Sequence, residues 1–247
     1  CLVGSEMCIR DSLNILYISE EYKNKKLTDK ESELLNSAVH TLYQARLNRP
    51  RPHLDDKIIS AWNGMMISAL VEAAGVFDNQ NYLDAAKTAA GFMQNNLMDK
   101  KTQRLYRRMR SDEPGIEATL DDYVWYIKGL LALYGRTSSK QWLELAQQLT
   151  AKQVQLFYDD NKRGFYESAT DKNVLFRSKS AYDGALPAPN AVAVENLYRL
   201  AGLSGENKWR KMANDTLASF GASINSSPGS AAWMTSLISE QLTDSSE

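Results

Sequence analysis

Residues 49–64 read RPRPHLDDKIISAWNG, which places a histidine and two adjacent carboxylates just before an apolar helical pattern. Two later segments also combine aspartate with such a pattern: LDDYVWYIKGLLALYGRT from residue 120 and DGALPAPNAVAVENLYRLAG from residue 183. If these helices run in one direction, their starts converge on a single opening. The candidate catalytic residues are then Asp55, Asp56, Asp121, Asp122 and Asp183. Crowded carboxylates raise the pKa of at least one member, and a protonated and an ionised carboxyl group together are what glycoside hydrolysis requires.

Each aspartate also has a structural explanation, because a carboxylate at a helix start accepts main-chain N–H bonds. Thr119 lies three residues before Asp122, which is the spacing of a capping box. We expect one aspartate of each adjacent pair to cap its helix, and the second carboxylate then exceeds what the cap needs. The sequence does not give the distances between the carboxyl groups, so inverting and retaining hydrolysis both stay open.

Further residues near these helix starts are candidate substrate ligands. They are His53, Trp62, Asn63, Tyr182 and Asn190. An aromatic ring can stack on the C–H face of a sugar, and Asn63 stands next to a glycine that permits close helix approach. Asn190 has two interpretations of equal weight, as a cavity ligand or as the cap of the helix that follows it. Trp125, flanked by apolar residues, is expected in the core.

The helices that position these residues alternate along the chain. Asp56, Asp122 and Asp183 are 66 and 61 residues apart, a spacing that suits helical hairpins with elaborate connections. Between them lie more charged amphipathic helices, expected to be outer helices with one wet side, as in residues 81–99, 140–160 and 207–224. We expect about eight helices, with small β-hairpins at residues 104–110 and 163–179.

Composition limits the function classes. The chain has 247 residues, 43% of them hydrophobic and 24% charged, with a net charge of −1. One large globular domain is expected, and the near-neutral balance argues against a nucleic-acid partner. The sequence contains no stretch of roughly 20 apolar residues and no signal-peptide pattern, so we expect no membrane partner and a cytoplasmic location.

The opening dodecamer CLVGSEMCIRDS has no periodicity and resembles translated adapter sequence, so we predict that residues 1–12 are non-native and that the domain is 13–247. Both cysteines lie in this dodecamer, which leaves no thiolate metal site or cysteine nucleophile in the domain. With two histidines in the chain, a multi-histidine zinc site is not expected, and we predict neither metal nor cofactor.

The segments PHLDDKIISAWNG, LDDYVWYIKGLLALY, FYDDNKRGFYES and DGALPAPNAVAVENLYRL resemble one known protein family. It is the family of thioredoxin-domain-containing proteins that includes the YyaL-like and spermatogenesis-associated protein 20-like members. The resemblance covers about residue 14 to the end and concerns the C-terminal domain. It implies an all-α fold, an (α/α)6 toroid of the six-hairpin glycosidase type. It also implies an N-terminal thioredoxin-like domain in the full-length parent.

A ring of six hairpins needs more helices than this sequence supplies, so we expect an incomplete toroid with apolar faces exposed at its open edge. The related sugar 2-epimerases use a pair of histidines, and here His53 stands alone, because His40 lies in a preceding amphipathic helix. Ala188 and Ala191 stand where the family pattern has serine. We therefore expect a domain that binds or processes carbohydrate, with glycoside hydrolysis as the first reaction to test. The alternative is a catalytically inactive interaction or regulatory scaffold attached to the thioredoxin-like domain.

Overall fold

The computed structural model describes residues 4–8, 13–17, 20–23, 26–170 and 174–244. It divides into two compact units, Cys1–Asp55 and Asp56–Glu247. In the first unit, strands β1 (Gly4–Cys8) and β2 (Leu13–Tyr17) pair antiparallel, and helices α1 (Glu20–Lys23) and α2 (Asp29–Leu47) follow. The N-terminus of α2 has a capping box formed by Thr28 and Glu31. None of the residues of α2 is buried.

The second unit alternates helices with connections of varied length. Its elements are β3 (Ile58–Ile59), α3 (Ser60–Val76), α4 (Gln80–Asn96), β4 (Tyr106–Arg110), β5 (Glu113–Glu117), α5 (Leu120–Thr137), α6 (Lys140–Phe157), α7 (Pro189–Ser204), α8 (Asn207–Ser219), α9 (Gly221–Ser226), the 3-10 helix η1 (Pro228–Ala231) and α10 (Ala232–Asp244). Within the described residues, eight helices of the chain are 13 residues or longer, as predicted.

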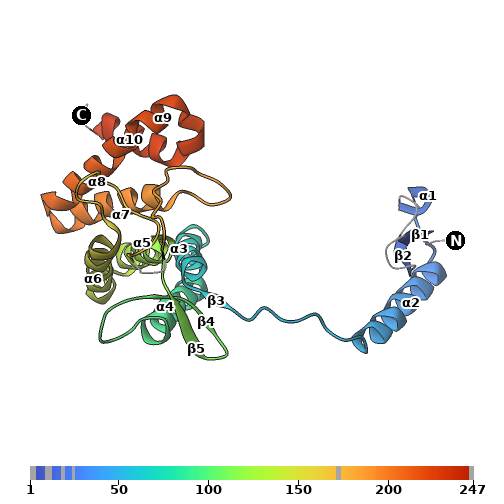
Figure 1. The fold of residues 1–247 in the computed structure, drawn as a ribbon. Coiled ribbons are helices and arrows are strands. Elements are labelled where there is room, and N and C mark those ends of the chain that lie inside the picture. The colour runs from blue at the N-terminus through green and yellow to red at the C-terminus, as the bar shows by residue number, and fades with distance from the viewer. Residues whose placement is uncertain (1–3, 9–12, 18–19, 24–25, 171–173, 245–247) are drawn as a thin grey trace. The chain divides into compact units, whose positions relative to one another are not determined.

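Inner and outer helices are clearly distinguished by burial. α5 packs between α3 and α7, and α10 packs on α7, while α4, α6 and α8 each pack on the inner helix that precedes them (Figure 1). Most side chains of α5 are buried, whereas α6 buries one face that includes Trp142, Leu145 and Leu149. This arrangement is an arc of an α/α toroid, which confirms the predicted fold class.

α3 and α5 cross at two glycines. A Cβ added to Gly64 would lie 2.5 Å from the main-chain carbon of Trp125, and one added to Gly129 would lie 3.0 Å from the carbonyl oxygen of Gly64. Main chain therefore meets main chain at this crossing, and no larger side chain fits there. The predicted close approach at Gly64 is confirmed.

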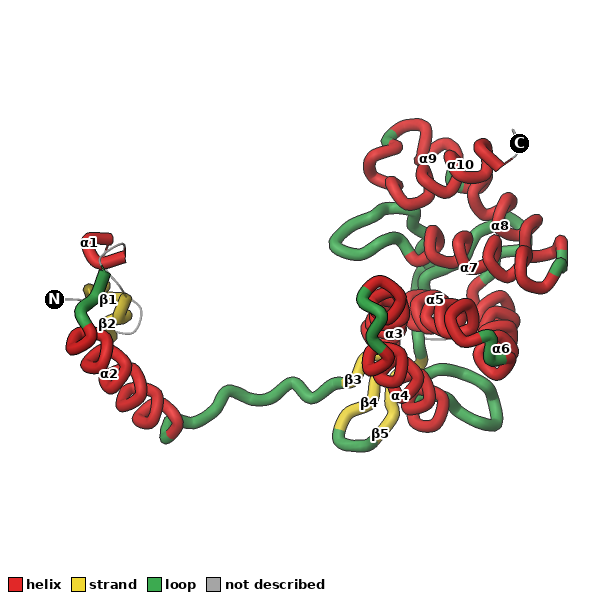
Figure 2. Tube along the Cα trace, turned by 180° about the vertical axis from the view of Figure 1, so that it is seen from behind, coloured by secondary structure: helices red, strands yellow, loops and turns green. Residues whose placement is uncertain are grey.

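A three-stranded antiparallel sheet, ordered β3-β4-β5, lies at the start of α3 (Figure 2). Ile58 pairs with Met109, and the Ser60 hydroxyl donates a hydrogen bond to the carbonyl oxygen of Tyr106 at 2.6 Å. The pairing removes residues 58–59 from the helix, so α3 begins at Ser60 and not at the aspartates before it. The β4-β5 hairpin confirms the prediction for residues 104–110.

The second predicted hairpin, at residues 163–179, is wrong for the part of that segment that is described. Its backbone forms one isolated bridge, from Tyr158 to Phe165, and otherwise runs as an irregular connection. Arg177 holds it in place by donating to the carbonyl oxygens of Ser168 and Leu156 at 2.9 and 3.0 Å. Apart from one main-chain bond across the segment, from the N–H of Glu167 to the carbonyl oxygen of Ser178 at 2.9 Å, side-chain hydrogen bonds replace the strand ladder that aromatic and β-branched residues had suggested.

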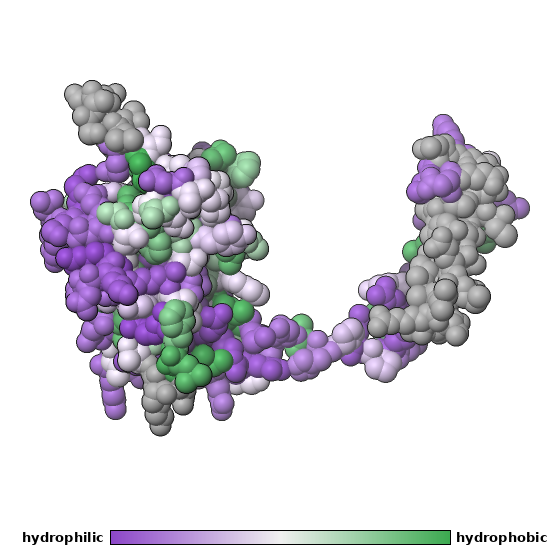
Figure 3. All heavy atoms as spheres, turned by 45° about the horizontal axis from the view of Figure 1, so that its top comes forward, coloured by the Kyte–Doolittle hydropathy of each residue, from purple (hydrophilic) through white to green (hydrophobic). Residues whose placement is uncertain are grey.

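Apolar side chains reach the surface in separate patches among hydrophilic ones on the face shown in Figure 3. α3 contributes Trp62 and Met66, which are 61% and 57% exposed, as expected for an inner helix at the edge of the arc. Among the helices of the described residues, none combines the length and the apolar character needed to cross a membrane.

Candidate functional site

The first turn of α5 carries two adjacent aspartates in different environments. Asp122 is fully buried, and its Oδ1 accepts a hydrogen bond from the main-chain N–H of Ala61 at 3.1 Å. Its Oδ2 accepts from the N–H and the hydroxyl of Thr119 at 2.9 and 3.1 Å. This is the predicted capping box, and it also ties the start of α5 to the start of α3. Burial raises the pKa of Asp122 and these hydrogen bonds oppose the rise.

Asp121 is the second carboxyl group of the pair and is only partly buried. Its pKa is raised from 3.8 to about 6, first by burial and then by the negative charge of Asp122. Arg107 acts against this rise and Glu167 adds to it. Asp121 is therefore partly protonated near pH 6, which suits a group that donates a proton to a substrate.

Two charged side chains from other connections surround this turn. Arg107 on β4 donates from Nη1 to the Thr119 hydroxyl at 2.9 Å, and the same atom lies 3.9 Å from Asp122 Oδ2. Glu167, after α6, accepts the main-chain N–H of Leu120 on its carbonyl oxygen at 3.0 Å. Strand and connection thus meet at the start of α5 and bring both signs of charge to Asp121.

The Glu167 side chain is held in turn, because its Oε2 accepts from the hydroxyl of Ser178 at 2.5 Å. A cavity of about 330 Å³ lies beside Thr119. It is lined by residues 116–119 from β5 and its end, by Ser168 and Ala169, and by Val174. Its volume lies at the lower end of the range for small-molecule sites.

Asp183 performs one hairpin later the same structural task as Asp122. Its Oδ1 accepts from the main-chain N–H of Ala188 at 2.7 Å, and its Oδ2 accepts from that of Trp233 at 2.8 Å. One carboxylate therefore joins the starts of α7 and α10. Successive inner helices are linked by aspartate at their N-terminal ends, which supports a common direction for these helices.

Asp56 lies apart from this group. It pairs with Arg110 at 2.9 Å, with both side chains 41% exposed. Arg107 and Arg110 are three residues apart on β4, so their side chains project from opposite faces of the strand. The structure thus brings Asp121 and Asp122 together with Arg107, while Asp56 engages the other face of β4.

The other residues predicted for the site, the catalytic candidate Asp55 and the ligand candidates His53, Asn63 and Tyr182, are more dispersed. His53 and Asp55 belong to the first unit, where both are exposed. Tyr182 is 66% exposed. Asn63 donates to the carbonyl oxygen of Ile59 at 2.9 Å and lines a cavity of about 590 Å³ bordered by α3 and α4. Asn63 therefore faces an outer helix.

The Asn190 side chain holds the connection between α6 and α7 by hydrogen bonds to its main chain. It is fully buried, its Oδ1 accepts from the N–H of Phe165 at 2.8 Å, and its Nδ2 donates to the carbonyl oxygens of Phe165 and Ser180 at 2.9 and 3.1 Å. Of its two interpretations, the helix cap is wrong, because α7 starts at Pro189 and its N-cap is Ala188. The Tyr123 hydroxyl, accepting from the N–H of Leu105 at 3.0 Å, braces the preceding connection in a similar way.

Three inner helices also share a cluster of polar and aromatic side chains. Lys128 on α5 pairs with Glu195 on α7, and the indole N–H of Trp233 on α10 donates to Glu195 at 3.0 Å. Trp125 packs edge-to-face on Trp233 with ring centroids 6.4 Å apart. It is 6% exposed, which confirms its predicted core position, and its Nε1 has no hydrogen-bond partner among the described residues.

Sequence patterns did not predict Arg107 or Glu167 as site residues. Arg107 belongs to a dense basic cluster on residues 104–110, which was the available signal. No sequence pattern marks Glu167 as a site residue, because a main-chain hydrogen bond from the N–H of Leu120 to its carbonyl oxygen brings it to α5. No group of three or more histidine, cysteine or acidic side chains suited to a metal ion occurs in the part of the chain that is described.

Comparison with known proteins adds one family and several relatives. The model of glycosyl hydrolase family 76 matches residues 58–187. The spermatogenesis-associated protein 20 of Homo sapiens is 32% identical over 218 residues. The match covers 84% of this chain, and the chain spans 28% of the length of that relative.

Solved structures share the fold. The family 76 α-mannanase of Bacteroides thetaiotaomicron superposes with a TM-score of 0.57 at 16% identity, over 78% of this chain and 56% of that one. An α-1,6-mannanase of Salegentibacter sp. gives a TM-score of 0.54 at 10% identity, over 78% and 54%. It is an inactive variant with two adjacent aspartates replaced by asparagine, in complex with α-1,6-mannotriose.

Proposed function

This chain belongs to glycosyl hydrolase family 76, and we propose that its toroid unit hydrolyses a glycosidic bond at the start of α5. The single observation that carries the proposal is the state of Asp121, a partly buried carboxyl group with a pKa raised to about 6 beside a buried carboxylate. Glycoside hydrolysis uses one carboxyl group to protonate the leaving oxygen and an ionised one to activate water or attack the sugar.

Each residue at the turn then has a role. Asp121 donates the proton to the leaving oxygen, and the negative charge of Asp122 helps to keep Asp121 protonated. Asp122 itself is positioned by the N–H groups of Thr119 and Ala61 and holds the turn rigid. Glu167 is the second carboxylate within electrostatic reach of Asp121. We assign it to the activation of water.

The substrate class is suggested by the relatives. The α-1,6-mannanase of Salegentibacter sp. is inactive when two adjacent aspartates are changed to asparagine, and it holds α-1,6-mannotriose in that form. Asp121 and Asp122 are the adjacent pair at the start of an inner helix here. We therefore propose an α-1,6-linked mannose oligosaccharide as the first substrate to test, seated in the cavity beside Thr119.

Hydrolysis of α-1,6-linked mannose oligosaccharides by the full chain, followed by release of reducing ends at pH 6, tests the proposal. Asp121→Asn should lower kcat at least about 100-fold, because it removes the proton donor. Asp56→Asn is the matched control, since Asp56 engages the opposite face of β4, and it should change kcat less than about twofold. Equal rates for the unchanged chain and Asp121→Asn would refute the role of Asp121.

The attached thioredoxin-like domain and the cytoplasmic location stay predictions. The chain spans 28% of the length of the human spermatogenesis-associated protein 20. Mass spectrometry of the endogenous protein and fractionation of the cells that make it test these two points.

A further inference from the structure

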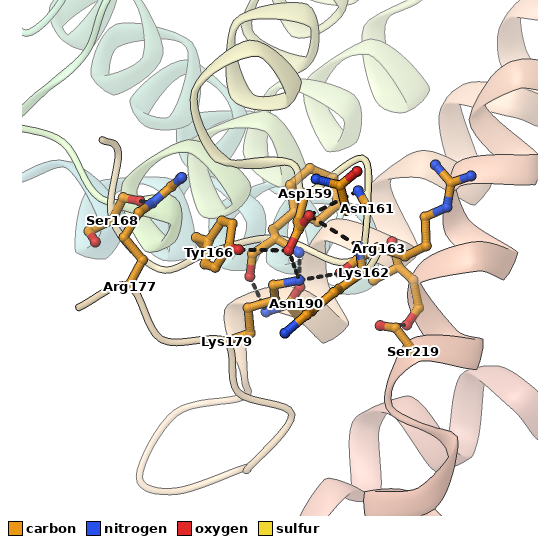
Figure 4. A network of polar contacts seen from close by, with 12 residues as sticks. Asp159, Asn161, Lys162, Arg163, Tyr166, Ser168, Arg177, Lys179, Asn190 and Ser219 are labelled. Atoms are coloured by element: carbon orange, nitrogen blue, oxygen red, sulfur yellow. Dashed lines mark hydrogen bonds and ion pairs between the residues drawn. The ribbon is translucent and has the colours of Figure 1, made fainter. Parts of the chain in front are cut away.

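The connection between α6 and α7 folds onto the end of α8 and forms an open cavity of about 390 Å³ (Figure 4). Such a volume accommodates a small ligand. The lining residues come from three segments: Lys162, Arg163, Tyr166, Phe176, Arg177, Lys179, Ser219 and Phe220. Four of these eight residues are cations and none is a carboxylate, so the cavity favours a negatively charged ligand.

Two of the four cations already have carboxylate partners. Lys179 pairs with Asp159 at 2.7 Å, and Arg163 lies 3.8 Å from Asp215, which also binds Lys211 at 2.9 Å. These contacts neutralise part of the positive charge. The charge that remains for a ligand is carried by the other two cations of the lining.

Arg177 is the better placed of those two. Its guanidinium donates to the carbonyl oxygens of Ser168 and Leu156 and stacks 3.9 Å from the centre of the Tyr166 ring. Carbonyl groups fix the guanidinium without cancelling its charge, and among the described residues it pairs with no carboxylate. A planar guanidinium held in this way suits a phosphate or sulfate group. Lys162 supplies a second, exposed ammonium group.

The turn that carries Lys162 is rigidly built around Asp159. Oδ1 of Asp159 accepts from the main-chain N–H groups of Asn161 and Lys162 at 3.0 and 3.1 Å, and Oδ2 accepts from the Tyr166 hydroxyl at 2.7 Å. The Lys179 ammonium, and then the Tyr166 hydroxyl, hold the pKa of Asp159 well below its usual range. The carboxylate therefore stays ionised and keeps the turn closed.

Gly164 allows this turn to pack closely against the end of α8. Its φ is +73°, and a Cβ at this position would lie 3.0 Å from the Ser219 hydroxyl and 3.2 Å from the Phe220 ring. Two walls of the cavity are thus fixed against each other. The third wall carries Phe176, which is 82% exposed and places an aromatic ring at the cavity.

We infer that this cavity binds a small ligand that carries a phosphate or sulfate ester on a ring. The anion faces Arg177 and Lys162, and the ring of the ligand packs on Phe176. The inference does not depend on the proposed hydrolysis, because none of the lining residues belongs to the turn that carries Asp121. Ester groups of this chemistry occur on sugars and on nucleotides, which the experiment separates.

Isothermal titration calorimetry of the full chain tests the inference with four probes: inorganic phosphate, mannose 6-phosphate, AMP and uncharged mannose. We expect saturable binding of at least one phosphate probe at or below about 1 mM and none of mannose. Tighter binding of mannose 6-phosphate than of inorganic phosphate identifies a sugar ester, and tighter binding of AMP identifies a nucleotide; either result supports the inference. Equal binding of all three phosphates would overturn the inferred packing of a ligand ring on Phe176.

Variants locate the binding. Arg177→Gln should weaken it roughly tenfold or more, since a hydrogen bond to a charged group contributes about 1.5–3 kcal/mol. Lys162→Gln should weaken it about threefold and leaves the fold intact, because its side chain is exposed. Lys140→Gln makes the same charge change at the opposite end of α6 and should have no effect. Absence of phosphate binding up to about 10 mM would overturn the inference, and so would binding that neither Arg177→Gln nor Lys162→Gln weakens.

Discussion

Replacement of Asp121 by asparagine should stabilise the protein at neutral pH and have little effect in acid. The native pKa of Asp121 is about 6 and the reference value is 3.8. The native state favours the neutral form of Asp121. The contribution of this group to stability is therefore fully present below pH 3.8 and is lost as the pH rises through about 6. Asparagine has nearly the same shape and never ionises, so it avoids this loss.

The magnitude follows from the pKa difference. At 1.36 kcal/mol for each pH unit, a rise from 3.8 to about 6 corresponds to about 3 kcal/mol at pH 7 for a fully desolvated group. Asp121 is only partly buried, so solvent screening reduces the expected gain to about 1–2 kcal/mol. At pH 4 the gain should fall below about 0.5 kcal/mol, since the carboxyl group is then largely protonated in the native state and pH 4 lies close to the reference pKa of 3.8, where the unfolded state has only begun to gain from ionisation.

Urea denaturation followed by far-ultraviolet circular dichroism at pH 4 and pH 7 measures both values. Asp56→Asn provides the matched control, because its ion pair with Arg110 is on the surface and should contribute less than about 1 kcal/mol. The reasoning would be refuted if Asp121→Asn were no more stable than the unchanged chain at pH 7. An equal gain at both pH values would also refute it, since the effect would then not arise from ionisation.

Two further substitutions test the packing that supports the site. Gly64→Ala should destabilise the chain by about 2–3 kcal/mol, because its Cβ would overlap the main chain of Trp125. As a control, the Cβ of Gly91→Ala in α4 meets no atom within 4 Å, and this substitution should stabilise the chain by about 0.5–1 kcal/mol. Similar effects of the two substitutions in urea denaturation would contradict the close crossing of α3 and α5. Asn190→Ala should lower the free energy of unfolding by about 2–3 kcal/mol. It should also speed amide hydrogen exchange at Phe165, because the N–H of Phe165 loses its acceptor. Unchanged exchange at Phe165 would contradict the role of Asn190 in holding this segment.

Local patterns predicted the parts of the structure that local chemistry decides. The capping box of Thr119 and Asp122 was visible because its members lie three residues apart on one turn. Gly64 was recognised as a close-approach position, although the partner helix was not specified. The division into inner and outer helices followed from how much of each helix circumference is apolar.

Long-range contacts decided the rest. Neither interpretation of Asn190, as a cavity ligand or as a helix cap, included its contact with Phe165, because Phe165 lies 25 residues upstream and no turn motif records such a separation. α3 was expected to begin near Asp55, but pairing of Ile58 and Ile59 with β4 takes these residues into the sheet. The cavity beside Arg177 was not predicted at all, because Ser219 and Phe220 meet the α6–α7 connection only in the folded chain.

A crystal structure of the full chain carrying Asp121→Asn, soaked with α-1,6-mannotriose, tests the central claim most directly. If Asp121 is the proton donor, a glycosidic oxygen of the trisaccharide should lie about 3 Å from the side chain at position 121, with a sugar ring in the cavity beside Thr119. A trisaccharide bound elsewhere on the toroid, with no glycosidic oxygen near position 121, would contradict the account.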